Sequence, residues 1–330
     1  MIRPHQFSKR ALVAFILSGS CAAYSIQAVF AQGFPVKAVR LIVPYAPGGG
    51  VDIMARIIAP RLGEGLGQQI VVDNRPGGGT IIGTELVARA APDGYTLLMA
   101  NPAHAANPAL RVKLPYDSLK DFAPVGLVAL SSSVLVVHPS LPVRTVGDLV
   151  RLAKSKPGQL NYASGGTGSA IYLAMESFKS TTGIDVVHVP YKGAAPALTD
   201  VIGGQVPMMF TTTPASLAHI KSGRLRALGA SSGKRLPLLP DVPTIAESGY
   251  PGFELNDWYG VLAPAATPRT IIDRLNAAIN KALTAADVRE RISGLGAEPA
   301  SSTPDQFGER LTHEVARWAK VIKTPVANLD

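Results

Sequence analysis

The sequence predicts a two-domain α/β protein with mostly parallel sheets that are covered by helices on both faces. Short apolar runs rich in β-branched residues alternate with amphipathic helical patterns along the chain. Most of the runs are continuously apolar, which is typical of parallel strands buried on both sides. The alternation indicates crossover helices between parallel strands. The predicted strands are 39–43, 70–72, 96–99, 134–137, 160–163, 186–189, 208–210, 225–229 and 259–263.

Capping residues mark where several helices begin. Thr145 with Asp148, and Thr303 with Gln306, have the spacing of capping boxes. The helix after Thr303 carries an apolar stripe formed by Phe307, Leu311, Val315, Trp318 and Ile322. No linker separates the two predicted domains, so the chain is expected to pass between them more than once. Runs 134–137 and 259–263 are the predicted crossing strands.

The first thirty-one residues are predicted to be a cleavable export signal. Arg3, Lys9 and Arg10 precede a short apolar run, and VFA at 29–31 places small residues at the −3 and −1 positions. The run is too short for a membrane span, which needs roughly 20 residues. The mature chain would then begin near Gln32. A retained amphipathic helix and lipid attachment at Cys21 are the alternatives.

The composition of residues 32–330 argues against several classes of protein. They contain no cysteine, which leaves no disulfide, thiol nucleophile or cysteine-bound metal. Loss of a leader with three basic and no acidic residues lowers the formal net charge from +9 to +6. The remaining basic residues are scattered without interleaved aromatic residues, so nucleic acid is not an expected partner.

Three glycine-rich loops each follow a predicted strand and precede a predicted helix. They read PYAPGGG at 44–50, NRPGGGT at 74–80 and SGGTGS at 164–169. Ligands of open parallel sheets bind beyond the carboxyl ends of the strands, and free N–H groups at helix N-termini bind anions. The loops therefore predict a carboxylate site, although glycines that serve only the turns are the alternative. No Gly-Lys-Ser/Thr nucleotide motif is present.

The ligand is expected to meet backbone N–H groups and hydroxyls of these loops. Gly48, Gly49, Gly78 and Gly168 are expected to present N–H groups. The full set of predicted ligand-binding residues is Tyr45, Pro47, Gly48, Gly49, Gly78, Gly79, Thr80, Ser164, Gly165, Thr167, Gly168, Ser169 and Thr211. The histidines after the leader lie in unrelated contexts, and no HExxH or Gly-x-Ser-x-Gly motif occurs. We therefore predict no catalytic residue, metal or cofactor.

Eight stretches spread over the mature chain carry a family resemblance. They are PYAPGGG at 44–50, VDNRPGG at 72–78, APDGYTLL at 91–98, LPYD at 114–117, HVPYKG at 188–193, PALTD at 196–200, LPDVPT at 239–244 and LN at 275–276. In this order they resemble the extracytoplasmic solute receptors of tripartite tricarboxylate transporters, often called Bug-type receptors.

This resemblance implies a two-lobed periplasmic binding protein fold of the type II-like kind, with two crossing strands. Lobe 1 would comprise residues 32–135 and 259–330, and lobe 2 residues 136–258. A small carboxylate would bind in the cleft through backbone amides, hydroxyls and water. The partner would be a membrane permease, or a sensor protein, and the receptor would be a monomer in the periplasm.

The chain departs from the family pattern at three positions. Val51 stands where the first loop usually has Thr or Ser, and Tyr172 where His is frequent. Thr211 follows run 208–210 where Asp is common, and would offer an uncharged hydroxyl. We therefore expect carboxylates without an α-amino group to be preferred. The alternative is that Thr211 only caps the strand.

The sequence thus predicts a periplasmic receptor that captures a carboxylate without transforming it. An exported enzyme on the same scaffold is the second hypothesis, which a turnover assay would reveal. An interaction protein is the third, and it predicts that no cleft is sealed between the lobes.

Overall fold

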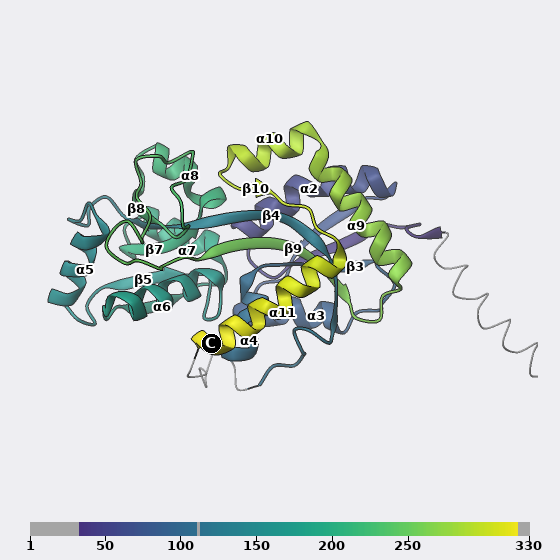
Figure 1. Ribbon diagram of the computed structural model, residues 1–330, viewed down its shortest axis with the longest axis horizontal. Coiled ribbons are helices and arrows are strands. Elements are labelled where there is room, and N and C mark those ends of the chain that lie inside the picture. Colours follow the sequence, from purple (N-terminus) through teal and green to yellow (C-terminus); the bar gives the residue numbers. More distant parts are fainter. Residues whose placement is uncertain (1–32, 111–112, 323–330) are drawn as a thin grey trace, which may run out of the picture.

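The computed structural model describes residues 33–110 and 113–322 (Figure 1). The predicted signal peptide, its cleavage site and Cys21 lie outside these residues. The strands are β1 (Val39–Val43), β2 (Ile70–Asn74), β3 (Thr96–Ala100), β4 (Phe122–Val137), β5 (Asn161–Ser164), β6 (Val187–Pro190), β7 (Met208–Thr212), β8 (Arg226–Ala230), β9 (Asn256–Pro264) and β10 (Glu298–Pro299). The helices are η1 (Gly78–Thr80), α2 (Gly50–Leu66), α3 (Ile81–Ala88), α4 (Pro102–Leu110), α5 (Val146–Ser155), α6 (Ala170–Thr182), α7 (Ala194–Ile202), α8 (Thr213–Lys221), α9 (Arg269–Thr284), α10 (Ala286–Gly294) and α11 (Pro304–Val321).

All nine predicted strands are present, and so are the two predicted capping boxes. The Thr145 hydroxyl accepts from the Asp148 amide at 3.0 Å, and the Thr303 hydroxyl from the Gln306 amide at 3.1 Å. None of the helices within the described residues combines the length and the apolar character that a membrane crossing needs.

The strands join in the order β2-β1-β3-β9-β4-β7-β5-β6, with β8 and β10 also paired to β4. Strand β1 runs parallel to β2 and β3, and β5 runs parallel to β6 and β7. Every pairing of β4 or β9 among the described residues is antiparallel. The predicted parallel pairing therefore holds for the outer strands of each lobe. The two central strands, β4 and β9, pair in antiparallel fashion because the chain passes from the first lobe to the second along β4 and returns along β9.

Strand β4 belongs to both lobes. Its residues up to Ser132 pair with β9, and from Ser133 onward it pairs with β7 and β8. Figure 1 shows β4 and β9 running together across the middle of the molecule. The sequence predicted only the last four residues of β4, because Pro124 and Gly126 interrupt the apolar pattern before them. The exact lobe boundaries at 135/136 and 258/259 stay predictions.

Each lobe is a sheet between helices. In the first lobe, neighbouring residues of β1 enter different cores, since Leu41 packs with α2 and α9 and Ile42 packs with α4 and α11. The second lobe has its own core of buried residues between Val134 and Phe253, to which α5, α6, α7 and α8 contribute. Helices therefore cover both faces, and the fold is two-lobed.

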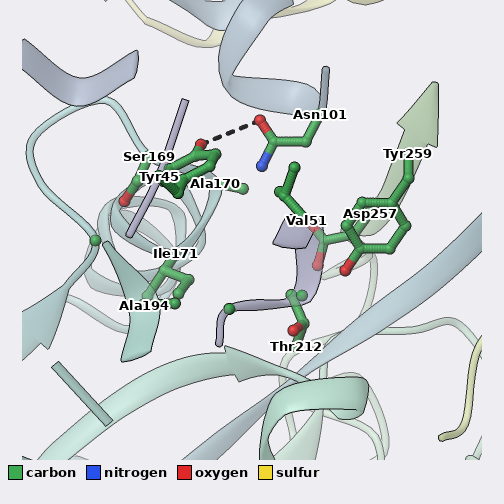
Figure 2. A pocket seen from close by; sticks show the side chains of 13 residues that line it. Tyr45, Val51, Asn101, Ser169, Ala170, Ile171, Ala194, Thr212, Asp257 and Tyr259 are labelled. Carbon is green, nitrogen blue, oxygen red and sulfur yellow. Dashed lines mark hydrogen bonds between the residues drawn. The ribbon is translucent and has the colours of Figure 1, made fainter. Parts of the chain in front are cut away.

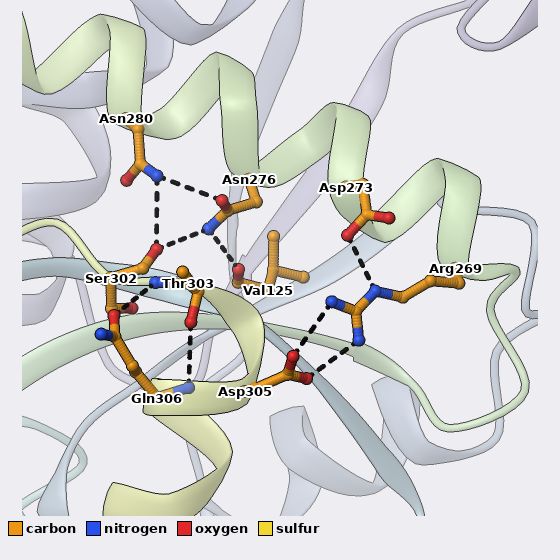
Figure 3. Close-up of polar contacts among 9 residues, drawn as sticks. All are labelled: Val125, Arg269, Asp273, Asn276, Asn280, Ser302, Thr303, Asp305 and Gln306. Carbon is orange, nitrogen blue, oxygen red and sulfur yellow. Dashed lines mark hydrogen bonds and ion pairs between the residues drawn. The ribbon is translucent and has the colours of Figure 1, made fainter.

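The C-terminal segment returns to the first lobe. The Asn276 side chain on α9 donates to the carbonyl oxygens of Val125 at 2.7 Å and Ser302 at 2.8 Å, which ties β4 to the start of α11 (Figure 3). Arg269 on α9 also pairs with Asp305 at 2.9 Å. In α11 the predicted stripe packs into a core, with Phe307, Leu311 and Trp318 buried.

Candidate functional site

A small chamber lies where the two lobes meet, and its free volume is about 30 Å³. Both lobes and one crossing strand contribute to its walls (Figure 2). The lining residues are Tyr45, Gly49, Gly50, Val51, Asn101, Gly165, Ser169, Ala170, Ile171, Ala194, Thr212, Asp257 and Tyr259. Most of this surface is apolar, and a few polar groups are placed at definite points.

Helices from both lobes begin at the chamber. Each of α2, α4, α6, α7 and α8 has its first residue, or the residue directly before it, in the chamber wall. The first N–H groups of a helix have no partner within the helix, and its N-terminus carries a partial positive charge. Five such ends around one space, each from a helix of nine residues or more, favour the binding of a small anion.

The side of the chamber formed by the first lobe is fixed by Tyr45 and Asn101. The Tyr45 hydroxyl donates to Asn101 Oδ1 at 3.1 Å, and the same oxygen accepts from the Ala103 amide at 3.3 Å. Burial raises the pKa of Tyr45, so its hydroxyl keeps its proton. Because Asn101 Oδ1 is occupied in this way, its amide nitrogen is left to face the chamber (Figure 2).

A buried carboxylate holds the first two glycine loops together. Asp52 accepts hydrogen bonds from the Gly48 amide at 2.9 Å, from Asn74 Nδ2 at 2.9 Å and from Arg56 Nε at 3.0 Å. Asn74 Nδ2 also donates to the Tyr45 carbonyl at 3.0 Å. Burial opposes ionisation of Asp52, but these hydrogen bonds outweigh it and lower the pKa of the carboxyl. The network positions the loop before α2, and Asp52, Asn74 and Arg56 themselves lie outside the chamber wall.

Three further polar side chains gather at one end of the chamber, across from Ser169 (Figure 2). Asp257 and Tyr259 come from β9 and Thr212 from the end of β7 (Figure 2). The Ser133 hydroxyl donates to Asp257 Oδ2 at 2.6 Å. Burial raises the pKa of Asp257 to about 6, the hydrogen bond from Ser133 opposes this, and the charge of Glu314 adds to it.

A wider vestibule of about 480 Å³ adjoins the chamber and shares Tyr45 and Gly165 with it. Of the predicted site residues, Tyr45, Gly49, Gly165 and Ser169 line the chamber. The vestibule is lined by Tyr45, Gly78, Gly79, Thr80, Gly165 and Thr167. The structure thus brings the three glycine loops together around two neighbouring spaces that share Tyr45 and Gly165.

Five predicted residues line neither space: Pro47, Gly48, Ser164, Gly168 and Thr211. The Gly48 N–H is already bonded to Asp52, so it does not face a ligand. Ser164 is fully buried, and its hydroxyl lies 2.6 Å from His188 Nε2. Thr211 is also fully buried, because successive strand residues point to opposite faces and it is Thr212 that faces the chamber.

Sequence reasoning missed Asn101, Thr212, Asp257 and Tyr259. Asn101 directly follows β3 and Thr212 ends β7, so a stricter search of strand ends would have found both. Asp257 and Tyr259 lie near the beginning of β9, where no general rule places a ligand.

The described residues contain no group of three or more His, Cys, Asp or Glu side chains that could hold a metal ion. His104 is buried, and burial lowers its pKa to about 4 although the Ser118 carbonyl opposes this. The neutral ring donates to that carbonyl over 2.9 Å, which is a packing role.

Two lobes joined by crossing strands around an anion-favouring chamber define a solute-binding protein. The chain belongs to the tripartite tricarboxylate transporter family of receptors, whose family model matches residues 54–326. The periplasmic binding protein BugD is 34% identical, with a TM-score of 0.86 over 88% of this chain and 98% of BugD. MatC of Rhodopseudomonas palustris, solved with malate, is 35% identical, with a TM-score of 0.86 over 88% of this chain and all (100%) of MatC. R. palustris Rpa4515, solved with adipate, is 38% identical, with a TM-score of 0.85 over 89% of this chain and 100% of its own.

Proposed function

We propose that this protein is a periplasmic receptor that captures a small organic carboxylate between its lobes and delivers it to a membrane permease. The observation that carries the proposal is the convergence of five helix N-termini on one chamber. Backbone N–H groups and helix dipoles stabilise a carboxylate without any basic side chain. Among the described residues no Lys or Arg lines the chamber, while Lys192 lines the adjoining vestibule. The malate and adipate bound by MatC and Rpa4515 support this ligand class.

The protein acts by binding and not by catalysis. Closure of the lobes over the ligand would shift an open–closed equilibrium, and the permease would recognise the closed form. The leader ending at Ala31 directs export, and the mature receptor begins near Gln32 and functions as a monomer. A sensor protein in place of the permease is the alternative partner.

The direct test is to identify what the protein carries. Protein purified from the periplasm without unfolding would be denatured, and the released small molecules identified by mass spectrometry. Calorimetry with those molecules should then give one site per chain. Gly50→Leu provides the matched control, because a Cβ at Gly50 would already lie 2.5 Å from the hydroxyls of Thr212 and Tyr259 and the larger side chain would fill the chamber. Release of no carboxylate, or equal binding by this variant, would contradict the proposal.

A further inference from the structure

Asp257 is a buried carboxylate with half of its hydrogen-bonding capacity free. It is 8% exposed and lines the chamber near the beginning of β9. Oδ2 accepts from the Ser133 hydroxyl. Among the residues that the structure describes, Oδ1 has no hydrogen-bond partner, and it belongs to a side chain that faces the space a ligand would occupy.

No cation neutralises this carboxylate within the described part of the chain. The nearest charged groups are on α11, where Glu314 raises the energy of an ionised Asp257. Arg317 lines a small neighbouring cavity with Asp257, but its guanidinium is engaged by Glu314 at 3.6 Å and by the Glu254 carbonyl at 3.2 Å. The ionisable groups on the chamber side are the hydroxyls of Tyr45 and Tyr259. Buried charges in proteins are normally paired. An ionised Asp257 has no such partner among the described residues, which leaves a place for a donor group of the ligand.

Two hydroxyls beside Asp257 have spare hydrogen-bonding capacity. Thr212 Oγ1 and Tyr259 Oη are buried close to each other and to Ser131, and neither makes a well-aligned hydrogen bond to a described residue. Both lie 2.5 Å from the position that a Cβ on Gly50 would take, so they converge on the start of α2. Unsatisfied buried polar groups cost stability, and a ligand that bonds to them removes that cost.

We propose that Asp257 determines specificity by accepting a hydrogen bond from a hydroxyl or ammonium group of the ligand. This inference rests on the proposed function. The helix N-termini bind the carboxylate, and Asp257 with Thr212 and Tyr259 binds the donor group elsewhere on the same molecule. The chamber therefore selects hydroxy or amino acids over the corresponding unsubstituted acids. The sequence argument from Thr211 pointed away from amino acids because it found no acidic residue, and Asp257 supplies one from a different strand.

Two matched series of acids test the inference, each differing only in a hydrogen, a hydroxyl or an ammonium group. They are succinate, malate and aspartate, and phenylacetate, mandelate and phenylglycine. Affinities are measured by calorimetry on the wild type, on Asp257→Asn and on Glu254→Gln. A hydrogen bond to a charged group changes affinity by about ten- to a hundredfold. We expect the wild type to prefer the hydroxy or amino acid over the unsubstituted acid by this factor, and Asp257→Asn to lose the preference.

Glu254→Gln is the matched control. It also removes one carboxylate charge, but Glu254 lies three residues before Asp257, is exposed and does not line the chamber. It should keep the wild-type ratios. Comparison of malate with aspartate shows whether the donor is a hydroxyl or an ammonium group.

The inference would be overturned by equal wild-type affinities within each series, which needs no variant to fold. It would also be overturned if Asp257→Asn kept the wild-type ratios of affinity between substituted and unsubstituted acids. The same holds if succinate bound as tightly as malate with uptake of one proton, because a proton on Asp257 would then replace the donor group of the ligand. These outcomes leave the proposed function intact. Failure of every carboxylate to bind would overturn the proposed function and the inference together.

Discussion

The backbone amide of Ala46 donates a 3.2 Å hydrogen bond to the carbonyl of Lys192. This bond joins the loop after β1, in the first lobe, to the loop after β6, in the second. Beside it, a Cβ on Gly49 would lie 3.3 Å from the Cβ of Ala194, and a Cβ on Gly193 would lie 2.9 Å from the Ala46 amide nitrogen. Small residues therefore allow the two lobes to touch across the cleft.

Gly49→Val should weaken ligand binding without unfolding the protein. Gly49 has φ −82° and ψ 167°, which valine adopts readily, so the backbone is not strained. The added methyl groups would collide with Ala194 when the lobes close. Overpacking costs about 1–3 kcal/mol, which calorimetry would register as a loss of affinity of about five- to a hundredfold. Gly294→Val is the control, because nothing lies within 4 Å of the position of its Cβ. Unchanged affinity in Gly49→Val would show that this contact has no part in closure.

Asp52→Ala should lower the free energy of unfolding by about 2–3 kcal/mol. The substitution removes the acceptor of the Gly48 amide and of one N–H of Asn74 Nδ2, which keeps its bond to the Tyr45 carbonyl. Each unsatisfied donor costs about 1–3 kcal/mol. Urea unfolding measures the change. Asp273→Ala, at an exposed ion pair with Arg269, should change stability by less than about 0.5 kcal/mol. A similar loss in both variants would refute the structural role given to Asp52.

Thr212→Val and Thr211→Val should have opposite consequences. Thr212 faces the chamber, so loss of its hydroxyl should lower the affinity for the ligand by about tenfold or more. The Thr211 hydroxyl is buried without a partner among the described residues, so valine should leave binding unchanged and raise stability by about 1 kcal/mol. Calorimetry and thermal unfolding of both variants decide the point. Weaker binding in Thr211→Val would restore Thr211 to the site.

Asp257→Asn should stabilise the ligand-free protein at high pH but not at low pH. Because burial raises the pKa of Asp257 to about 6 from 3.8, the folded state favours the protonated form. Wild-type stability therefore falls as the pH rises from about 4 through 6 and stays lowered above that. The variant should exceed the wild type by about 1–3 kcal/mol at pH 8 and equal it near pH 4. Chemical unfolding at the two pH values measures this, and a difference independent of pH would show that Asp257 does not titrate as stated.

Local sequence signals predicted most of the fold. Continuous apolar runs located nine strands, since burial on both faces leaves a clear pattern, and Thr145 and Thr303 marked helix starts because their side-chain hydrogen bonds are local. The N-terminal three-quarters of β4 escaped prediction. Its strand conformation is imposed by pairing with β9, more than a hundred residues later, and not by its own composition.

The residues that line the candidate site were predicted where they lie in loops after strands, and they were missed where their position depends on long-range packing. The glycine loops predicted helix N-termini, and the structure places these loops around the chamber and the vestibule. Thr211 was chosen in place of Thr212 because a shift of one residue reverses the face of a strand. Asp257 could not be found, because its place in the chamber follows from the crossing of β9 between the lobes.

The pairing of β3 with β9 has a consequence for the order in which the two lobes can be completed. Leu98 meets Leu262 in this pair, so the first lobe's sheet has an open edge until more than 260 residues have been made. The second lobe, in contrast, takes its core from the continuous stretch between Val134 and Phe253. Domains generally fold as units. When the chain emerges with its N-terminus first, the inserted lobe has all the residues of its core before the first lobe does, and the first lobe is complete only when α11 packs on it.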